Sequence, residues 1–247
     1  DVTVVADTGA FITQADGFKY LHVGVISSVV PSSGQESTPV TISGTNLQGG
    51  GEEIATVTLA FVNAVIVSAS NTVVEVVAAY TNKVGNGDVT IRADTGATVS
   101  LADGWTQLAP ATVNNVNPAT FQVGSKVEIS GTNLLHGGSE LTTVSFGGVD
   151  VEEFAADDST LTAIVAHRDE AGSVDLLLVS DSGASTTFAD AANYLEASSV
   201  TDIEPTSGQI GTKVQITGER LLGGGSSIAS VNFGSVSVDI VTGDQDD

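Results

Sequence analysis

The chain has 247 residues, of which 41% are hydrophobic, and 30 Asp and Glu residues outnumber seven Lys and Arg residues to give a net charge of −23. Such an acidic surface repels phosphate groups, so we expect no binding to nucleic acid or to an anionic membrane surface. The chain contains no cysteine, which excludes disulfides and thiolate metal sites, and no run of 18 or more apolar residues of the kind that inserts into a membrane.

The sequence repeats itself, and the repeat sets the order of the predicted elements. The interval from Pro31 to Pro118 is 87 residues, and the interval from Pro118 to Pro205 is also 87 residues. The same spacing, without insertion or deletion, relates Gly44, Gly131 and Gly218; Gly51, Gly138 and Gly225; Asp16, Asp103 and Asp190; and Leu21, Leu108 and Leu195.

The repeat predicts four segments. Residues 1–24 are expected to be the C-terminal strands of a preceding module, and residues 25–111 and 112–198 to be two complete modules, called module one and module two below. Residues 199–247 are expected to be the N-terminal part of a further module, which stops at Gly243-Asp244-Gln245-Asp246-Asp247 before its last strands. We therefore interpret the chain as a window on a longer repeat protein.

Module one is expected to contain about seven short strands and almost no helix, the pattern of a Greek-key sandwich. The expected strands are 25–30, 39–43, 54–61, 65–67, 72–79, 88–92 and 98–101. The turn Asp94-Thr95-Gly96 fits a three-residue hairpin loop in which glycine supplies a positive φ. Alternation along the strands predicts a core that includes Val40, Ile42, Val57, Leu59, Val89, Ile91, Val99 and Leu101.

Only about three residues connect one module to the next. The expected linkers are His22-Val23-Gly24, Ala109-Pro110-Ala111 and Glu196-Ala197-Ser198. Such short connections limit bending, so we expect an all-β protein of tandem Ig-like sandwiches arranged as an elongated, stiff rod. Each module would add roughly 40 Å, given a rise of about 3.3 Å per strand residue.

Several motifs resemble those of the IPT/TIG domain family. They are Ile203-Glu204-Pro205-Thr206-Ser207-Gly208, the run from Gly211 to Gly218, and Val231-Asn232-Phe233-Gly234, with counterparts such as Gly131-Thr132-Asn133-Leu134 and Gly44-Thr45-Asn46-Leu47. Module one departs from the pattern at Ser37-Thr38-Pro39, and the last module departs at Glu219-Arg220.

The resemblance implies an Ig-like sandwich of the early-set type and says little about activity. The family occurs in cell-surface receptors, in large secreted or surface-anchored repeat proteins, as accessory modules of polysaccharide-active enzymes, and in the dimerisation domain of some transcription factors. The last context fits poorly, because those proteins need basic DNA-binding loops and this chain is acidic.

No constellation of residues predicts catalysis or metal binding. His22, His136 and His167 fall at three different phases of the repeat, and a metal site would need them to converge with carboxylates, so we expect isolated, exposed histidines. The carboxylate pairs Glu52/Glu53, Glu152/Glu153 and Asp157/Asp158 could perform acid–base chemistry, but we expect solvated charges. We therefore predict no catalytic, cofactor-binding or metal-binding residue.

Recurring aspartates raise the hypothesis of a calcium site. Asp7, Asp94 and Asp181 occupy one position of the repeat, and Asp1, Asp88 and Asp175 occupy another. Calcium needs six to eight oxygen ligands at one point, and the linkers supply almost no carboxylates. A turn-forming role for Asp in Asp-Thr-Gly is sufficient, so we expect no cofactor, with calcium as the alternative that remains open.

The glycine-rich loops and the single tryptophan could bind a ligand. The loops are Gln48-Gly49-Gly50-Gly51, His136-Gly137-Gly138-Ser139 and Gly223-Gly224-Gly225-Ser226, where we expect glycine to permit a wide turn. Trp105 shares its phase with Phe18 and Ala192, so we expect it to pack near the module end instead of forming an exposed carbohydrate platform.

These observations predict a non-enzymatic structural or adhesive region of an extracellular filament, stalk or cell-surface protein, which could assemble laterally or end to end. The expected partners are other copies of the chain or its own neighbouring modules, and also surface glycans or proteins. The alternative is a ligand- or carbohydrate-binding ectodomain of a receptor, or an accessory region of a polysaccharide-active enzyme. Loop differences at Arg220 or Lys83 leave room for this alternative.

Overall fold

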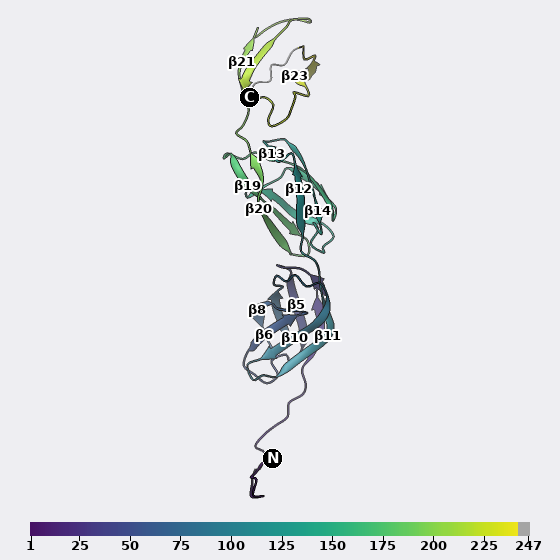
Figure 1. The fold of residues 1–247 in the computed structure, drawn as a ribbon, viewed down its shortest axis with the longest axis vertical. Coiled ribbons are helices and arrows are strands. Elements are labelled where there is room, and N and C mark those ends of the chain that lie inside the picture. The colour runs from purple at the N-terminus through teal and green to yellow at the C-terminus, as the bar shows by residue number, and fades with distance from the viewer. Residues whose placement is uncertain (242–247) are drawn as a thin grey trace. The chain divides into compact units, whose positions relative to one another are not determined.

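The computed structural model describes residues 1–241, and within them every regular element is a β-strand (Figure 1). This confirms the predicted all-β class. Two compact units make up the chain, Asp1–Leu108 and a second that begins at Ala109. The described residues contain no helix that is long and apolar enough to cross a membrane. The predicted end of the last module, Gly243 to Asp247, lies outside the described residues.

The first unit begins with a small hairpin. Strands β1 (Val2–Val5) and β2 (Phe11–Gln14) pair antiparallel, and all of their side chains are exposed. The turn between them contains Gly9 with a φ of 84°. This hairpin lies one repeat before the larger hairpin of module one.

Module one is a sandwich of two sheets, one ordered β3-β5-β9-β8 and the other β4-β11-β10-β6-β7. The strands are β3 (Val25–Val30), β4 (Ser33–Gly34), β5 (Pro39–Thr45), β6 (Ile54–Leu59), β7 (Val62–Asn63), β8 (Val65–Ala69), β9 (Val73–Val77), β10 (Gly85–Ala93) and β11 (Thr98–Gln107). All seven predicted strands are present, and two short ones, β4 and β7, were not predicted.

The strand ends differ from the prediction where the backbone turns. The predicted strand 54–61 stops at Leu59, because Ala60 adopts a positive φ of 50° and starts a tight turn. Strands β10 and β11 are longer than predicted, because their hairpin continues past a bulge between Gly87 and Val89. The predicted hairpin loop is confirmed: Ala93 and Ala97 close it with a backbone hydrogen bond of 2.9 Å, and Gly96 has a φ of 87°.

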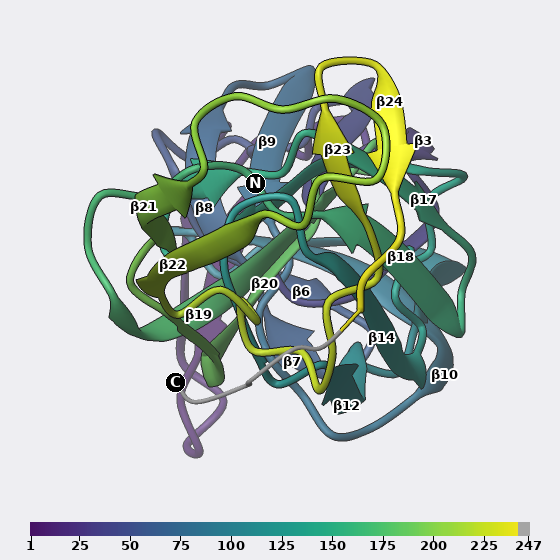
Figure 2. The same cartoon turned by 90° about the horizontal axis from the view of Figure 1, so that it is seen from above.

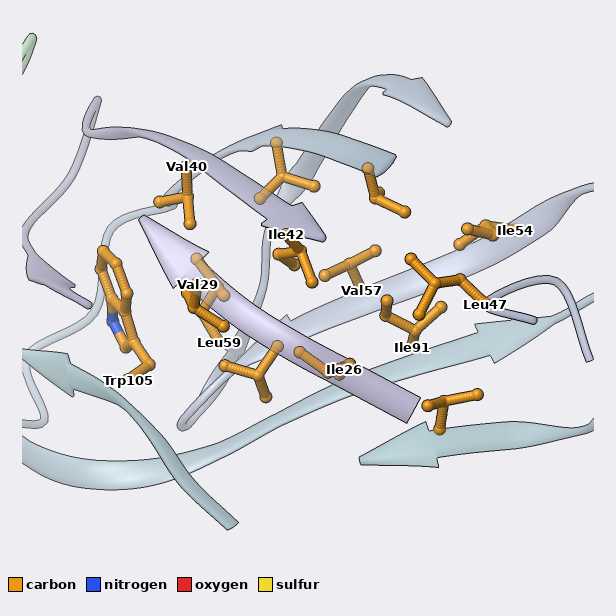
Figure 3. Packing of buried hydrophobic residues seen from close by; sticks show 14 of the residues in the cluster. Ile26, Val29, Val40, Ile42, Leu47, Ile54, Val57, Leu59, Ile91 and Trp105 are labelled. Carbon is orange, nitrogen blue, oxygen red and sulfur yellow. The ribbon is translucent and has the colours of Figure 1, made fainter. Parts of the chain in front are cut away.

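The core of module one lies between the two sheets (Figure 3). Ile42, Val57, Leu59 and Ile91 point into this layer and are fully buried, while Trp105 closes one end of it. The remaining predicted core residues are also buried except Leu101, which is only half-buried and packs against the rim of the cluster. It stands opposite Val89, next to the bulge where the hairpin leaves its regular register.

Module two, in the second unit, repeats the sandwich with sheets ordered β12-β14-β18-β17 and β13-β20-β19-β15-β16. The strands are β12 (Thr112–Asn117), β13 (Thr120–Phe121), β14 (Lys126–Thr132), β15 (Leu141–Phe146), β16 (Val149–Asp150), β17 (Glu153–Ala156), β18 (Thr160–Ile164), β19 (Gly172–Ser180) and β20 (Ser185–Tyr194). Its core includes an aromatic cluster of Phe121, Phe146 and Tyr194 that module one lacks.

In each sandwich a short strand near the N-terminal end pairs parallel with the last strand. In module one, Thr106 N donates to Ser32 O at 2.9 Å and Leu108 N donates to Gly34 O at 2.8 Å. Module two has the equivalent bonds, with 2.9 Å from Asn193 N to Ala119 O and 2.8 Å from Leu195 N to Phe121 O. The entering and leaving segments of each module are thus directly hydrogen-bonded.

The second unit continues with two hairpins of the further module (Figure 2). Strand β21 (Ser199–Glu204) pairs with β22 (Gln215–Glu219), and β23 (Val231–Phe233) pairs with β24 (Val236–Val238). Most side chains of these strands are exposed. Their order matches the start of the two complete modules.

Candidate functional site

The three glycine-rich loops share one backbone conformation. In module one, Gly49 N donates to Asn46 O at 3.0 Å and Gly51 N donates to Gln48 O at 2.8 Å, which folds the loop into two successive turns. The loops of module two and of the further module repeat both hydrogen bonds. The first turn residue has a positive φ in every case, namely Asn46 (51°), Asn133 (54°) and Arg220 (51°). Where a wide turn was expected, each loop is thus two successive tight turns.

The recurring aspartate of the hairpin loop holds the glycine-rich loop in place. In module two, Asp181 accepts hydrogen bonds from Ser139 N at 2.9 Å, from Ser139 Oγ and from Ser180 Oγ at 3.1 Å. The Ser139 side-chain hydrogen bond is the main reason why the pKa of Asp181 is below its ordinary value. In module one, Asp94 accepts from Glu52 N at 3.3 Å. The carboxylates are thus already occupied in joining two loops of their own module.

The second set of recurring aspartates stabilises the hairpin bulge. Asp103 N donates to Asp88 Oδ1 at 3.1 Å, and Asp190 N donates to Asp175 Oδ1 at 2.9 Å. The donating residues Asp103 and Asp190 have positive φ values of 49° and 50°. Within residues 1–241 no three His, Asp or Glu side chains are grouped as a metal ion would require. The expectation of no cofactor, with calcium as the open alternative, stays a prediction.

In each unit, one leucine before a linker packs on the glycine-rich loop that follows it. In the first unit, a Cβ atom added to Gly50 would overlap the Leu21 side chain, and Gly50 has a φ of 84°. In the second unit, a Cβ atom at Gly224, with a φ of 86°, would lie 2.9 Å from Leu195 Cδ1. Leu21 and Leu195 are equivalent positions of the repeat, as are the two glycines. Glycine is therefore needed here both for its conformation and for the close approach of leucine.

Polar contacts reinforce the junction in the second unit. Ser198 N donates to Gln122 Oε1 at 3.0 Å, and Gln122 Nε2 donates to Ser198 Oγ at 2.7 Å. Arg220 Nη2 donates to Ala197 O at 3.3 Å, while Arg220 Nη1 lies 3.2 Å from Glu196 Oε2. The departure from the family pattern at Arg220 thus contributes to an intermodular contact.

The structure places His136 in the protein interior, which corrects the expectation that all three histidines are exposed. His136 is fully buried, and its Nε2 lies 2.9 Å from Thr186 Oγ1. Its Nδ1 has no hydrogen-bond partner within the described part of the chain. Burial lowers the pKa of His136 below the usual value, since desolvation disfavours the charged imidazolium. Module one has Gly49 at this position, so neither the repeat nor the glycine-rich composition of the loop indicated a buried ring.

The other candidate residues do not converge. His22 is exposed, and His167 is exposed with its Nε2 3.1 Å from Asp169 Oδ1. The carboxylate pairs Glu52/Glu53, Glu152/Glu153 and Asp157/Asp158 are exposed as predicted. The pKa of Asp157 is lowered, mainly because its carboxylate accepts a hydrogen bond from Ser159 N in a tight turn. These groups occupy separate turns and strand faces, so they form no shared acid–base pair.

The two described pockets are open to solvent, and few of their lining side chains could take part in a reaction. One, of about 280 Å³, lies beside the first junction and is lined by Leu21, His22, Asn46, Gln48, Gly50, Gly51 and Asn71. The other, of about 600 Å³, runs between β12 and β20, and no residue in its lining is charged. Trp105 lies in neither, because its indole is fully buried and donates from Nε1 to Gln107 Oε1 at 3.1 Å. The expected packing role of Trp105 is confirmed.

Several solved structures align with this chain, and the following two have TM-scores below 0.5. The plexin A4 full extracellular region aligns with a TM-score of 0.44 and 20% identity, over 82% of this chain and 18% of that chain. SGBP-B from a xyloglucan utilization locus in Bacteroides uniformis aligns with a TM-score of 0.31 and 16% identity, over 68% of this chain and 49% of that chain. This chain thus spans less than a fifth of the plexin chain and about half of SGBP-B. No curated protein matches the sequence.

A family comparison agrees with the motifs and with the fold. The model of the IPT/TIG domain matches residues 25–104 and 198–246, which together make up more than half of the chain. Module two lies mostly outside these ranges, but it repeats the same strand order and the same loop geometry. The chain therefore belongs to the IPT/TIG domain family.

Proposed function

We propose that this chain is a non-enzymatic structural and adhesive segment of an extracellular or cell-surface protein, in which successive modules lock together into a stiff rod. Its partners would be its own neighbouring modules and further copies of the chain. The support comes from the junctions, from the acidic surface and from carboxylates that are engaged in turns or exposed to solvent.

The recurrence of one junction carries the proposal. Leu21 packs on Gly50 in the first unit, and Leu195 packs on Gly224 at the equivalent place in the second. A linker without such contacts would let its modules reorient freely, since domain motion is the default where little surface is shared. A leucine packed against the glycine-rich loop, with the Ser198–Gln122 hydrogen bonds in the same junction, favours one orientation.

Small-angle X-ray scattering on the whole chain tests the proposal. Leu195→Ala removes the junction side chain but leaves the backbone hydrogen bond from Leu195 N to Phe121 O in place. We expect the variant to show a broader distribution of interatomic distances than the wild type, with an unchanged circular dichroism spectrum. Val236→Ala is the matched control, because Val236 is an exposed apolar residue of β24, outside the linker, and it should scatter like the wild type.

Two results would contradict the rod. One is a wild-type chain that already scatters as a flexible string of beads. The other is a Leu195→Ala chain whose distance distribution equals that of the wild type. Either result would leave the IPT/TIG fold intact and would remove the mechanical role of the junction.

Carbohydrate binding, the alternative function, gains no support from the single tryptophan. Sugar-binding platforms commonly use exposed aromatic faces, and Trp105 has no exposed surface. Retarded migration of the chain in gels that contain soluble polysaccharide would favour this alternative over a purely structural role.

A further inference from the structure

The last junction, between module two and the further module, carries its own residues at three positions of the repeat. In chain order these positions hold His22, Ala109 and Glu196; Gly24, Ala111 and Ser198; and Asn46, Asn133 and Arg220. The structure brings the three residues of the last junction together. Ser198 Oγ donates a hydrogen bond to Arg220 O, and Arg220 Nη1 lies 3.2 Å from Glu196 Oε2. The three differences in the repeat therefore form one set at one place.

Arg220 joins the glycine-rich loop of the further module to the linker that precedes it. Its Nε and Nη2 donate to Ala197 O at 3.4 Å and 3.3 Å. At the start of module two, Asn133 makes the corresponding contact from Nδ2 to Pro110 O at 3.5 Å. Arg220 Nη2 also lies 3.4 Å from Glu219 Oε2. Arginine thus keeps the contact that asparagine makes and adds a positive charge between two carboxylates.

The first junction, between residues 1–24 and module one, is built differently at the same positions. A Cβ atom added to Gly24 would lie 2.5 Å from Asn46 O and 2.5 Å from Val99 Cγ2, so a serine has no room there. His22 and Asn46 line an open pocket of about 280 Å³ where the last junction has its ion pair. The first linker thus approaches its loop through glycine, whereas the last one bridges to its loop through a hydroxyl group and an ion pair.

We propose that Glu196, Ser198 and Arg220 are specificity determinants of the last junction, which select a following module that carries arginine at this loop position. The inference rests on the proposed function, since it requires that successive modules lock together. Specificity between similar interfaces commonly comes from repulsion in the wrong pair. A following module without this arginine would leave Glu196 of the linker and Glu219 of β22 close together with no cation between them, in a chain whose net charge is already −23.

The charges also determine how the last junction responds to salt. Both carboxylates are exposed, so each ion pair contributes little by itself and is screened by salt. Raising the ionic strength should therefore loosen the last junction of the wild type. In Arg220→Asn, salt should instead screen the repulsion between the two glutamates and tighten the junction. The first junction lacks this ion pair, since Asn46 carries no charge, and should not loosen with salt.

Distances between spin labels on the whole chain test the inference. Because the chain has no cysteine, an introduced pair of cysteines reports one distance. Ala155→Cys with Ser237→Cys reports the last junction, and Thr8→Cys with Asn82→Cys reports the first, since all four positions are exposed. Double electron–electron resonance then gives the distribution of each distance at low and high salt. At low salt, Arg220→Asn should enlarge the population outside the main distance by about two- to fivefold at the last junction alone.

Two further variants separate the selected contact from charge in general. Lys213→Asn removes the same charge from an exposed position of the same module and should leave the distribution unchanged. The triple variant Glu196→His, Ser198→Gly, Arg220→Asn installs the set of the first junction and should restore a narrow distribution that does not broaden with salt.

The outcomes distinguish this inference from the stiff rod. A narrow wild-type distribution that neither Arg220→Asn nor salt changes overturns the inference and leaves the rod in place. Equal broadening by Lys213→Asn and Arg220→Asn also overturns it, because net charge would then be responsible. Wild-type distributions that are broad at both junctions contradict the rod itself, and with it the inference.

Discussion

Modules one and two fill one end of the sandwich with aromatic side chains at different positions of the repeat. In module one, Trp105 of β11 is fully buried there, and the equivalent residue of module two is Ala192. In module two, the space is occupied by Phe121 and Tyr194, whose counterparts in module one are Gly34 and Gln107. An aromatic group lost at one position is replaced at two others.

This exchange shows that the repeat preserves filled volume more strictly than residue identity. Phe121 packs edge-on against Phe146 at 4.9 Å and against Tyr194 at 5.8 Å between ring centroids. Trp105 finds its hydrogen-bond partner in Gln107, and the Tyr194 hydroxyl donates to Ala166 O at 2.8 Å. Each solution is complete in itself, so a single substitution in either one should be costly.

Removing the large aromatic side chain from either module should have the largest effect. Trp105→Ala and Phe121→Ala should each lower the free energy of unfolding of their own module by about 3–5 kcal/mol, through lost burial and an unfilled cavity. Denaturant unfolding followed by circular dichroism measures the loss. Tyr80→Ala, at a 59% exposed position, is the control and should change little. A loss below about 1 kcal/mol in either module would mean that the filled volume is not what holds this end together.

The hydroxyl of Tyr194 should have a smaller effect, confined to module two. Tyr194→Phe keeps the ring and removes the donor to Ala166 O, leaving that carbonyl without its partner, so stability should fall by about 1–3 kcal/mol. Tyr20→Phe, at a 91% exposed position, serves as the control. Equal stability of Tyr194→Phe and the wild type would show that water replaces the lost bond.

The smallest expected difference between the two modules is in how their stability depends on pH. Burial depresses the pKa of His136 in the folded state, so the unfolded state binds the proton more readily. The stability of module two should therefore be greatest above the unfolded pKa of about 6.5 and should fall as pH decreases from there toward the folded pKa. Module one, with Gly49 at this position, lacks this contribution.

The single tryptophan makes this difference measurable. Trp105 fluorescence reports unfolding of module one alone, while hydrogen exchange of the β14 and β19 amides reports module two. His136→Gly, which installs the module-one residue, should abolish the extra pH dependence of module two. If the stability of both modules changes in parallel between pH 7 and pH 5, the buried imidazole is not responsible.

Much of the fold followed from periodicity in the sequence. Alternating residues such as Val40, Ile42, Val57 and Leu59 gave the strands and the core, because each strand has only one buried face. The Asp-Thr-Gly turn was likewise predictable, because a bulged hairpin requires a positive φ at glycine.

The remaining features depend on contacts between distant residues. The burial of His136 requires Thr186, 50 positions away, and the junction requires Leu21 to meet Gly50. The exchange of Trp105 for Phe121 and Tyr194 is visible only when first and last strands are seen side by side. Local sequence patterns carry no signal for such pairings.

The parallel pairing of short strands with β11 and β20 determines how each sandwich would bear tension. The entering segment at Ser32–Gly34 and the leaving segment at Thr106–Leu108 are joined by backbone hydrogen bonds, and the two segments run in the same direction. A pull on the two ends of a module would slide these segments past each other and strain the hydrogen bonds together, instead of opening them one after another. The rate of forced unfolding would then depend on rupturing this small patch as a whole, in module two as in module one.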